Sequence, residues 1–412
     1  MSVAAKPALQ IRGPQCTELL IPSNERERLP PVVSIVVPAL NEALTIAEFI
    51  VWCWDGLTRS GVPGEIIIID SSSDETSLIA LEHGARVVRT PKRGLGQAYI
   101  DAIPYIRGEL IIMGDCDLTY DFRELKNFVE SYKAGNEFVM GSRFKGQIEE
   151  GAMPLLHRYF GTPVTTWILN RIYGSHFSDI HCGMRAVTKA AFIKMNLTSS
   201  GWEYASEMVL KAKCLELAID EVPVVFYKDR EGRESHHRRN GWWSPWLAGW
   251  DNIKVMLIYN PKVFLINPGF FFTIIGLILT VILAFGPLSL GSIELNIHWM
   301  LLGVTFMILG FSLFQTGVVA NIFNGAKLGL DKIVPHYLHY NWGVSISIIM
   351  IILGILVNSR LLYSYIYSGF KLTVFSNTAI AGLALIMLGV QLFGFTLVIE
   401  LTSRLQKRVK RE

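Results

Sequence analysis

Two aspartates one residue apart carry the strongest chemical signal in this sequence. Asp115 and Asp117 lie just after Glu109–Met113, a short apolar run that predicts a buried strand. Hard divalent cations prefer carboxylate oxygens and often keep waters and substrate phosphates as their other ligands. The pair therefore predicts a site for Mg²⁺ or Mn²⁺, which would neutralise charge on a leaving diphosphate. Acidic turns and helix caps use the same residues, and they are the structural alternative.

The elements that would position this pair alternate between strand and helix. Short apolar, β-branched runs predict buried strands, and the segments between them predict helices. The expected elements, in chain order, are Val32–Val37, Ala43–Leu57, Glu65–Ile69, Ser77–His83, Arg86–Val88 and Glu109–Met113. This order predicts an α/β domain with a mostly parallel, Rossmann-like sheet, in which ligands bind beyond the carboxyl ends of the strands.

Polar residues follow the other expected strands as well. The first strand runs into 38–42 (Pro-Ala-Leu-Asn-Glu), and the second ends at Asp70. A carboxylate at the position of Asp70 can accept a hydrogen bond from a base or ribose, or it can cap a turn. The loop Pro91–Ala98 holds Gly94 and Gly96, which could let the backbone approach a phosphate or could form an ordinary turn. The third glycine of a dinucleotide fingerprint is missing.

The carboxyl-terminal part of the chain has a membrane protein's composition. Only 18% of the 412 residues are charged, against about 25% in globular proteins. Most lysines and arginines precede residue 263, and four later segments exceed the roughly 18 residues that a spanning helix needs. These segments lie near Val263–Phe285, Ile297–Phe323, Trp342–Leu362 and Ala379–Leu401. The pattern excludes a purely soluble protein, a disordered chain and a disulfide scaffold, and the net charge of +3 gives no indication of nucleic-acid binding.

Charge asymmetry predicts the orientation in the membrane. The basic tail from Arg404 and the middle loop with Lys327 and Lys332 would face the cytoplasm, as would both termini and the catalytic domain. We therefore expect an integral, multi-pass protein. The predicted regions are an extension at 1–30, a cytoplasmic catalytic domain at 31–228, a basic and tryptophan-rich juxtamembrane segment with interfacial helices at 229–262, and a four-helix membrane domain with a basic tail at 263–412.

Seven short motifs occur in an order that resembles the family 2 glycosyltransferases with the GT-A fold. The motifs lie at 38–42, 66–70, 92–98, 115–117, 141–144, 178–185 and 202–208. Within that family the chain is most similar to the polyisoprenyl-phosphate glycosyltransferases, the group of dolichol-phosphate mannose and glucose synthases. The likeness covers about residues 32–260. One departure is the stretch after Asp70, which is one residue shorter than the usual Asp-Asp-Gly-Ser-x-Asp-Gly-Thr and leaves uridine versus guanosine open. The other is Cys116, where a small residue such as alanine is usual.

The resemblance implies a nucleotide-sugar donor and assigns residues to it. Asp115 and Asp117 would bind Mg²⁺ or Mn²⁺ and so take part in catalysis. The residues expected to bind the nucleotide sugar are Pro38, Ala39, Asn41, Glu42, Asp70, Gly94, Gln97, Asp115, Cys116 and Asp117.

The acceptor implied by the resemblance is a phosphate monoester on a long isoprenoid chain. Its second pKa of about 6 leaves it mostly dianionic at neutral pH, so it needs placement and positive charge but no general base. The resemblance implies that Arg143 and Arg185 reach phosphate groups, and it makes Arg143 a candidate catalytic residue as well. The full set of candidate phosphate-binding residues is Arg143, Arg185, Lys228, Arg230 and Arg233. For the last three, a solvated loop of mixed charge is the alternative.

Two further carboxylates could act near the acceptor. Glu207 is a candidate catalytic carboxylate, although it could equally form a surface ion pair with Lys211 one helical turn later. Asp179 could likewise be a functional carboxylate near the acceptor or have a purely structural role. Either would have to serve as the base if the acceptor were a hydroxyl group.

The sequence thus predicts a membrane-bound, metal-dependent enzyme that moves a hexose, glucose or mannose, from a UDP- or GDP-sugar to polyprenyl or dolichyl phosphate on the cytoplasmic leaflet, with inversion. The alternatives are a glycosyltransferase with a hydroxyl acceptor, on a glycolipid or polysaccharide, and a transport or scaffold protein with an inactive domain. The bilayer is a further expected partner. Small residues in the spans also allow close helix contacts and a homo-oligomer, namely Gly303, Gly310, Gly382 and Gly389.

Overall fold

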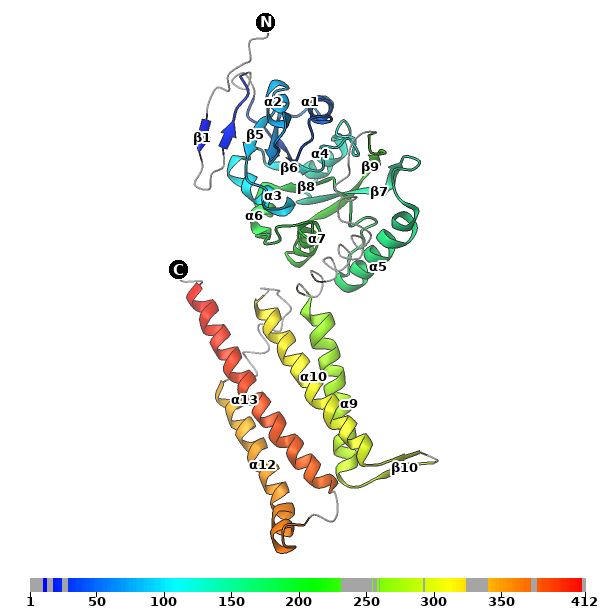
Figure 1. Ribbon diagram of the computed structural model, residues 1–412, viewed down its shortest axis with the longest axis vertical. Coiled ribbons are helices and arrows are strands. Elements are labelled where there is room, and N and C mark those ends of the chain that lie inside the picture. The colour runs from blue at the N-terminus through cyan, green and yellow to red at the C-terminus, as the bar shows by residue number, and fades with distance from the viewer. Residues whose placement is uncertain are drawn as a thin grey trace. The chain divides into compact units, whose positions relative to one another are not determined.

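A computed structural model of the chain describes residues 10–12, 18–23, 29–230, 254, 258, 260–291, 293–323, 340–371 and 376–409. The chain forms two compact units, Met1–Met256 and Leu257–Glu412. In the described residues, the first unit is a sheet flanked by helices and the second consists of long helices with one short hairpin (Figure 1).

The first unit is built on a nine-stranded sheet with the order β1-β2-β5-β4-β3-β6-β8-β7-β9. The strands are β1 (Gln10–Arg12), β2 (Glu18–Leu20), β3 (Val33–Ala39), β4 (Gly64–Asp70), β5 (Arg86–Arg89), β6 (Leu110–Met113), β7 (Phe138–Ile148), β8 (Arg185–Thr188) and β9 (Ile219–Phe226). Strands β5, β4, β3 and β6 are parallel neighbours, whereas β8 runs antiparallel between β6 and β7. This is the predicted α/β, Rossmann-like architecture.

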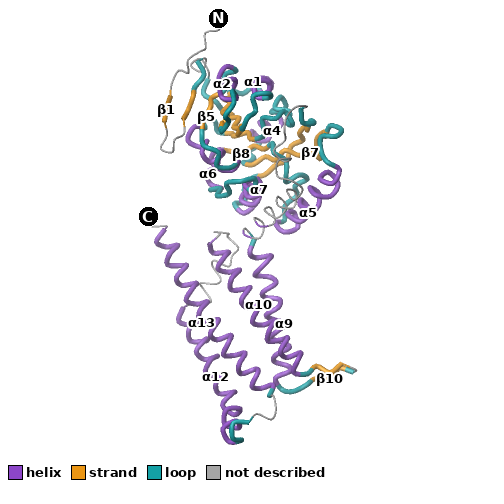
Figure 2. The backbone as a smooth tube through the Cα atoms, in the orientation of Figure 1, coloured by secondary structure: helices purple, strands orange, loops and turns teal. Residues whose placement is uncertain are grey.

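Helices cover the sheet between these strands (Figure 2). They are α1 (Ile46–Ser60), α2 (Thr76–Glu82), α3 (Leu95–Ala102), α4 (Lys126–Lys133), α5 (Thr162–Tyr173), α6 (Lys189–Met195) and α7 (Tyr204–Cys214). Short turns η2 (Ile103–Tyr105) and η3 (His157–Gly161) precede or follow them. The central strands read as unbroken apolar runs because helices bury both faces of the sheet.

The predicted strands and helices between residues 32 and 113 are all present, with only small shifts at their ends. Two differences have clear causes. The predicted loop Pro91–Ala98 gives way to α3 at Leu95, because Gly94, at φ +111, ends the turn and lets a helix begin. Part of the amino-terminal extension also joins the sheet, because Leu19 and Leu20 of β2 are buried against β5.

A buried carboxylate at the start of β4 supports this sheet. Glu65 accepts hydrogen bonds from the Ser34 hydroxyl and the Arg107 amide, and it pairs with the guanidinium groups of Arg86 and Arg107. Burial alone would raise the pKa of Glu65, but these hydrogen bonds and charges outweigh burial and lower it.

A lowered pKa predicts a pH-dependent loss of stability on the acid side. Glu65 stabilises the fold above its unfolded pKa, about 4.5, and this contribution disappears as the pH falls through the lower folded value. In Glu65→Gln we therefore expect a lower unfolding midpoint than wild type at neutral pH, and a difference that narrows below pH 4.5. Thermal unfolding in detergent, followed by circular dichroism at each pH, measures this. A difference that stayed constant with pH would contradict it.

The second unit holds the four apolar helices that the sequence predicts. They are α9 (Asn267–Ala284), preceded by the turn η5 (Lys262–Ile266), then α10 (Ile297–Phe323), α12 (Tyr340–Tyr367) and α13 (Asn377–Val409). The hairpin β10 (Leu288–Leu290) and β11 (Ile293–Leu295) joins the first two. The segments Lys262–Ala284, Ile297–Ile322, Tyr340–Tyr367 and Asn377–Leu405 are long and apolar enough to cross a membrane.

The glycines of these helices allow close packing between helices of the same chain. A Cβ atom on Gly276 would lie 2.4 Å from the Gly303 carbonyl oxygen, and one on Gly310 would lie 2.7 Å from that of Gly269, so α9 and α10 pack backbone to backbone. Gly354 and Gly382 bring α12 and α13 together in the same way. Gly303, Gly310, Gly382 and Gly389 therefore serve intramolecular packing, and an oligomer remains a prediction.

Candidate active site

The polar ends of three adjacent strands meet at one edge of the sheet. Ala39 at the end of β3 pairs with Asp70 at the end of β4, and Val36 pairs with Met113 at the end of β6. Because the strands are parallel, the segments that follow them leave the sheet on the same side. The structure therefore brings together the predicted residues of the 38–42, 70–76 and 115–117 segments.

Hydrogen bonds tie the first two segments to each other. The Asn41 amide donates to the Ser72 hydroxyl at 2.7 Å, and the Ser73 amide donates back to the Asn41 side-chain oxygen at 3.0 Å. Asn41 adopts a left-handed conformation, with φ +56, which asparagine tolerates better than most residues. The Glu42 amide donates to the Thr76 hydroxyl at 3.0 Å. The two segments thus form one cross-linked wall of the site.

Asp70 stabilises the 70–76 segment of this wall through hydrogen bonds. It is almost fully buried and accepts hydrogen bonds from the Ser72 amide and the Ser77 hydroxyl. These contacts correspond to the turn-capping alternative from the sequence. Contact between Asp70 and a nucleotide base stays a prediction.

The two aspartates of the third segment are half-buried and oriented by their neighbours. Asp117 accepts hydrogen bonds from the Thr119 amide and hydroxyl at 3.0 and 2.6 Å, both on one oxygen, Oδ1. Between the aspartates, the Cys116 thiol is buried and donates to the Pro38 carbonyl oxygen at 3.6 Å. The small residue at this position therefore links the third segment to the first.

This donor set fits a hard divalent cation. No group of three or more His, Cys, Asp or Glu side chains suited to a metal occurs among the described residues. Two partly exposed carboxylates at a strand end match the case in which the protein supplies two ligands while water and substrate phosphates supply the rest. Asp115 and Asp117 are thus the residues that would hold Mg²⁺ or Mn²⁺.

Two residues that the sequence analysis did not single out surround Asp115. The Gly183 amide donates to the Tyr120 hydroxyl at 2.8 Å, and a Cβ atom on Gly183 would lie 2.8 Å from Asp115 Oδ2. Burial, with help from the nearby Asp115 charge, raises the pKa of Tyr120 well above its usual value. The phenol therefore stays protonated beside the carboxylate. Gly183 belongs to the 178–185 motif, but the sequence does not show that this motif reaches Asp115, because the two lie far apart along the chain.

Gly183→Ala is expected to weaken metal binding. The added Cβ would push against Asp115 Oδ2 and against Tyr120 Cε2 at 3.0 Å, so the carboxylate must turn. Changes next to a ligand typically cost about 10- to 100-fold in metal affinity. A Mn²⁺ titration followed by electron paramagnetic resonance measures the change. Gly161→Ala, with its nearest contact at 3.7 Å, is the matched control; equal affinities in the two variants would contradict the expectation.

Gly94 and Gln97 pack against the chain itself. A Cβ atom on Gly94 would lie 2.2 Å from the Ser200 carbonyl oxygen, and the Gln97 amide donates to that same oxygen at 3.2 Å. The Gln97 side chain donates to Asp101 at 2.8 Å. Close packing onto the segment before α7 explains the glycine, and nucleotide binding by both residues remains a prediction.

Arg143 lies in a buried ion pair. Its guanidinium donates to both carboxylate oxygens of Asp179, at 2.6 and 2.9 Å, and Asp179 has no exposed surface. Asp179 also accepts the amides of Arg143 and His181, each at 3.2 Å. The pair therefore anchors the 178–185 segment, which carries Gly183, to β7.

Arg185 and Glu207 are also buried and engaged. The Arg185 guanidinium donates to the carbonyl oxygens of Ala205 and Cys182, at 2.9 and 2.6 Å. Glu207 accepts the amides of Thr198 and Ser199 and pairs with Lys211 at 2.7 Å. The ion pair of Glu207 is confirmed, but its surface position is wrong, because the carboxylate is fully buried. In this structure neither side chain is open to a substrate, so their predicted catalytic and phosphate-binding roles gain no support.

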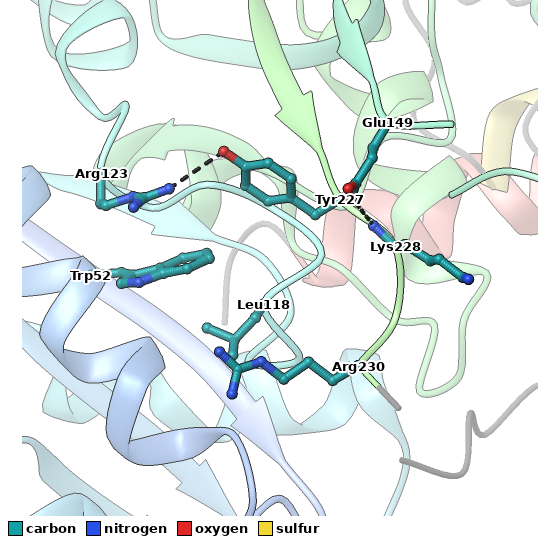
Figure 3. Close-up of a pocket in the computed structure, with 7 residues that line it drawn as sticks. All are labelled: Trp52, Leu118, Arg123, Glu149, Tyr227, Lys228 and Arg230. Carbon is teal, nitrogen blue, oxygen red and sulfur yellow. Dashed lines mark hydrogen bonds between the residues drawn. The ribbon is translucent and has the colours of Figure 1, made fainter. Parts of the chain in front are cut away.

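Lys228 and Arg230 instead border a cavity of about 330 Å³ that also includes Leu118, the residue after the Asp115–Asp117 pair (Figure 3). The full lining is Trp52, Leu118, Arg123, Glu149, Tyr227, Lys228 and Arg230. Arg123 lies 4.3 Å from the centre of the Trp52 ring and donates to Tyr227, and Arg230 pairs with Glu48. The predicted phosphate ligand Arg233 and the tryptophan-rich segment lie outside the described residues.

Among solved structures, the chain is similar to mannosyl-3-phosphoglycerate synthase from Rubrobacter xylanophilus, at 22% identity and a TM-score of 0.43, covering 55% of this chain and 74% of that one. Glucosyl-3-phosphoglycerate synthase from Mycobacterium tuberculosis, in complex with Mn²⁺, UDP and glucosyl-3-phosphoglycerate, matches at 20% identity and a TM-score of 0.41, covering 56% and 80%.

Sequence comparisons identify relatives with higher sequence identity than these solved structures. The low-salt glycan biosynthesis hexosyltransferase Agl6 of Haloferax volcanii is 32% identical over 367 residues, which is 88% of this chain and 87% of that protein. The dolichyl-phosphate hexose transferase of the same organism is 29% identical over 41% of this chain and 72% of its own length. The family model for glycosyl transferase family 2 matches residues 34–196, the part that carries the site. The chain therefore belongs to glycosyltransferase family 2, with a GT-A domain followed by four apolar helices that could span a membrane.

Proposed function

We propose that this glycosyltransferase moves a hexose, glucose or mannose, from a UDP- or GDP-sugar to a polyprenyl or dolichyl phosphate at the cytoplasmic leaflet, with inversion. The observation that best supports a phosphate acceptor, rather than a hydroxyl acceptor, is the burial of Asp179 and Glu207. A hydroxyl acceptor needs a base, and both carboxylates that would have to serve are held in buried ion pairs. A phosphate acceptor needs no base, because it is already an anion at neutral pH.

Donor binding is assigned to the cross-linked wall and the aspartate pair. The 38–42 and 70–76 segments would hold the nucleotide, while Asp115 and Asp117 would hold Mg²⁺ or Mn²⁺. When bound, the cation would neutralise the negative charge of the leaving diphosphate. Lys228, Arg123 and Arg230 line the cavity next to Leu118, and we assign the attraction of an anionic acceptor to Lys228 together with Arg230, which also pairs with Glu48.

The membrane helices and one relative support a lipid acceptor. Four apolar helices would keep the enzyme at the bilayer where a polyprenyl phosphate resides, and a relative is named a dolichyl-phosphate hexose transferase. Two of the polar side chains in the spans make contacts between helices: Gln315 donates to the Gln391 carbonyl oxygen, and the Gln391 side chain donates to Ser312. These contacts hold α10 and α13 together.

A donor panel tests the proposal. Membranes containing the chain would be incubated with polyprenyl phosphate, Mg²⁺ and each of several radiolabelled UDP- and GDP-sugars. We expect label from one donor to enter the organic phase, and to do so only when polyprenyl phosphate is present. No transfer from any donor, with no nucleotide released, would overturn the proposal.

A further inference from the structure

Arg185 on β8 is a buried arginine whose charge is held by backbone carbonyl groups. The side chain is 1% exposed, and its guanidinium donates to the carbonyl oxygens of Cys182 and Ala205. Its Nε atom is buried and has no hydrogen-bond partner. Within the part of the chain that the structure describes, Arg185 forms no ion pair with a carboxylate. Because a buried charge is costly unless it is paired, and arginine keeps its proton, this side chain indicates an electrostatic role.

The sheet register places this charge beside Asp115. Strands β6 and β8 are antiparallel neighbours, and Met113 lies directly opposite Arg185 (Figure 1). Two residues further on, the same register brings Asp115 opposite Gly183, in agreement with the 2.8 Å between a Cβ atom on Gly183 and Asp115 Oδ2. Side chains alternate along a strand, so Asp115 and Arg185 lie on the same face. They are diagonal neighbours, whose Cβ atoms lie about 7–8 Å apart in an antiparallel pair.

Two buried tyrosines connect Arg185 to the metal-binding segment. The Arg185 guanidinium carbon lies 5.9 Å from the centre of the Tyr204 ring, which lies 5.1 Å from the centre of the Tyr99 ring. The Tyr99 hydroxyl donates at 3.1 Å to the carbonyl oxygen of Gly114, the residue before Asp115. Burial raises the pKa of Tyr99 and Tyr204; the charge of Asp115 also raises both values, and that of Arg185 lowers them. Both phenols therefore stay neutral, and neither can balance the arginine.

The other charged groups near Arg185 balance each other. Asp179 accepts hydrogen bonds from two nitrogens of the Arg143 guanidinium, so this pair adds no net charge. The Cys182 thiol stays protonated, because burial raises its pKa to about 12. Once a divalent cation has neutralised the two aspartates of the 115–117 segment, the charge of Arg185 is left in excess. Burial weakens the screening of this charge, so it acts over several ångströms.

We propose that Arg185 gives the candidate metal site a fixed positive charge, which opposes the cation and favours the negative charge of the donor diphosphate. This role requires the proposed metal site at Asp115 and Asp117. Because the side chain is buried and held by carbonyl groups, the charge does not have to reorganise when the diphosphate leaves. Arg185 does not reach the substrate, so it is a positioning residue, which distinguishes this role from the direct phosphate contact expected from the sequence.

Two binding measurements in the full chain in detergent test this role. Arg185→Met removes the charge, and Arg185→Lys keeps it. Electron paramagnetic resonance gives the affinity for Mn²⁺ without nucleotide, and calorimetry gives the affinities for UDP and GDP at saturating Mn²⁺. The matched control is Arg86→Met, because Arg86 is another buried arginine of the same sheet, at the start of β5 and so away from the carboxyl ends of the strands.

We expect Arg185→Met to bind Mn²⁺ about tenfold more tightly than wild type, the effect of removing one charge about 10 Å from a divalent cation in a partly solvated site. The same variant should bind its nucleoside diphosphate at least about threefold more weakly, because an attractive charge is lost. Arg185→Lys and Arg86→Met should both stay close to wild type. If Arg185→Met does not express, Arg185→Gln gives the same measurement.

The opposite signs separate an electrostatic role from a structural one. Damage to the fold would weaken Mn²⁺ and nucleotide binding together, and that result in the charge-removing variant would overturn the proposal. Unchanged affinities for both ligands would overturn it as well. A wild-type chain that binds no Mn²⁺, even with UDP or GDP present, would instead contradict the metal site itself, and the role of Arg185 would fall with it.

Discussion

Asp117→Asn should lower the metal-dependent turnover of this enzyme on the order of 10²–10³-fold, the usual effect of losing one electrostatic group that stabilises developing charge. The substitution removes a negative charge from the predicted cation site. It should leave the fold intact, because the asparagine side chain keeps the oxygen that accepts from the Thr119 amide and hydroxyl. Initial rates of sugar transfer across a range of Mn²⁺ concentrations measure the effect.

The control for this variant is Asp55→Asn. Asp55 is a partly exposed aspartate on α1 that pairs with Arg59 on the surface. We expect its rate and its Mn²⁺ dependence to match wild type. A turnover of Asp117→Asn close to wild type, with an unchanged unfolding midpoint, would mean that the metal and the diphosphate bind elsewhere.

Arg143→Met should cost about 3–5 kcal/mol of unfolding free energy, the largest stability loss we expect from a single change. The substitution leaves Asp179 as a buried, unpaired carboxylate behind the segment that carries Gly183. Thermal unfolding in detergent measures the loss, with a thiol-reactive dye that reports exposure of Cys53, Cys116 and Cys182, all buried in the first unit.

Arg59→Met is the matched control, because Arg59 forms an exposed ion pair whose loss costs at most about 1 kcal/mol. The double variant Arg143→Met/Asp179→Leu should recover much of the loss, since it removes the buried charge as well. Were Arg143→Met no less stable than Arg59→Met, the buried pair would not hold the segment. A double variant that is stable but inactive would instead assign Arg143 a direct contact with phosphate.

Local sequence pattern was enough to predict the first half of the GT-A domain. Strands such as β3 and β4 are continuous apolar runs, and each is followed by a polar segment and a helix, so type and order could be inferred together. The antiparallel insertion of β8 between β6 and β7 could not be predicted, because it depends on pairing between strands far apart in the chain. The four apolar helices that could span a membrane were clear from length and hydropathy alone.

Some residues of the candidate site could likewise be predicted from local sequence pattern, whereas the contacts of others depend on the tertiary structure. Asp115, Asp117 and the 38–42 segment were found because each sits next to a recognisable strand. The partners of Arg143 and Arg185 were not, since Arg143 meets a carboxylate 36 residues away and Arg185 donates to backbone carbonyls that leave no mark in the sequence. The family resemblance and the chemistry of the guanidinium group marked both arginines as phosphate ligands, and only tertiary contacts reveal their buried partners.

One comparison of acceptors tests the central claim most directly. The purified chain in lipid nanodiscs would receive its labelled donor and Mg²⁺, with either a polyprenyl phosphate or the polyprenol of the same chain length. We predict a labelled lipid product with the phosphate, none with the alcohol, and none with either after a chelator removes the cation. Transfer to the alcohol at an equal rate, or transfer to the phosphate that survives the chelator, would contradict the account.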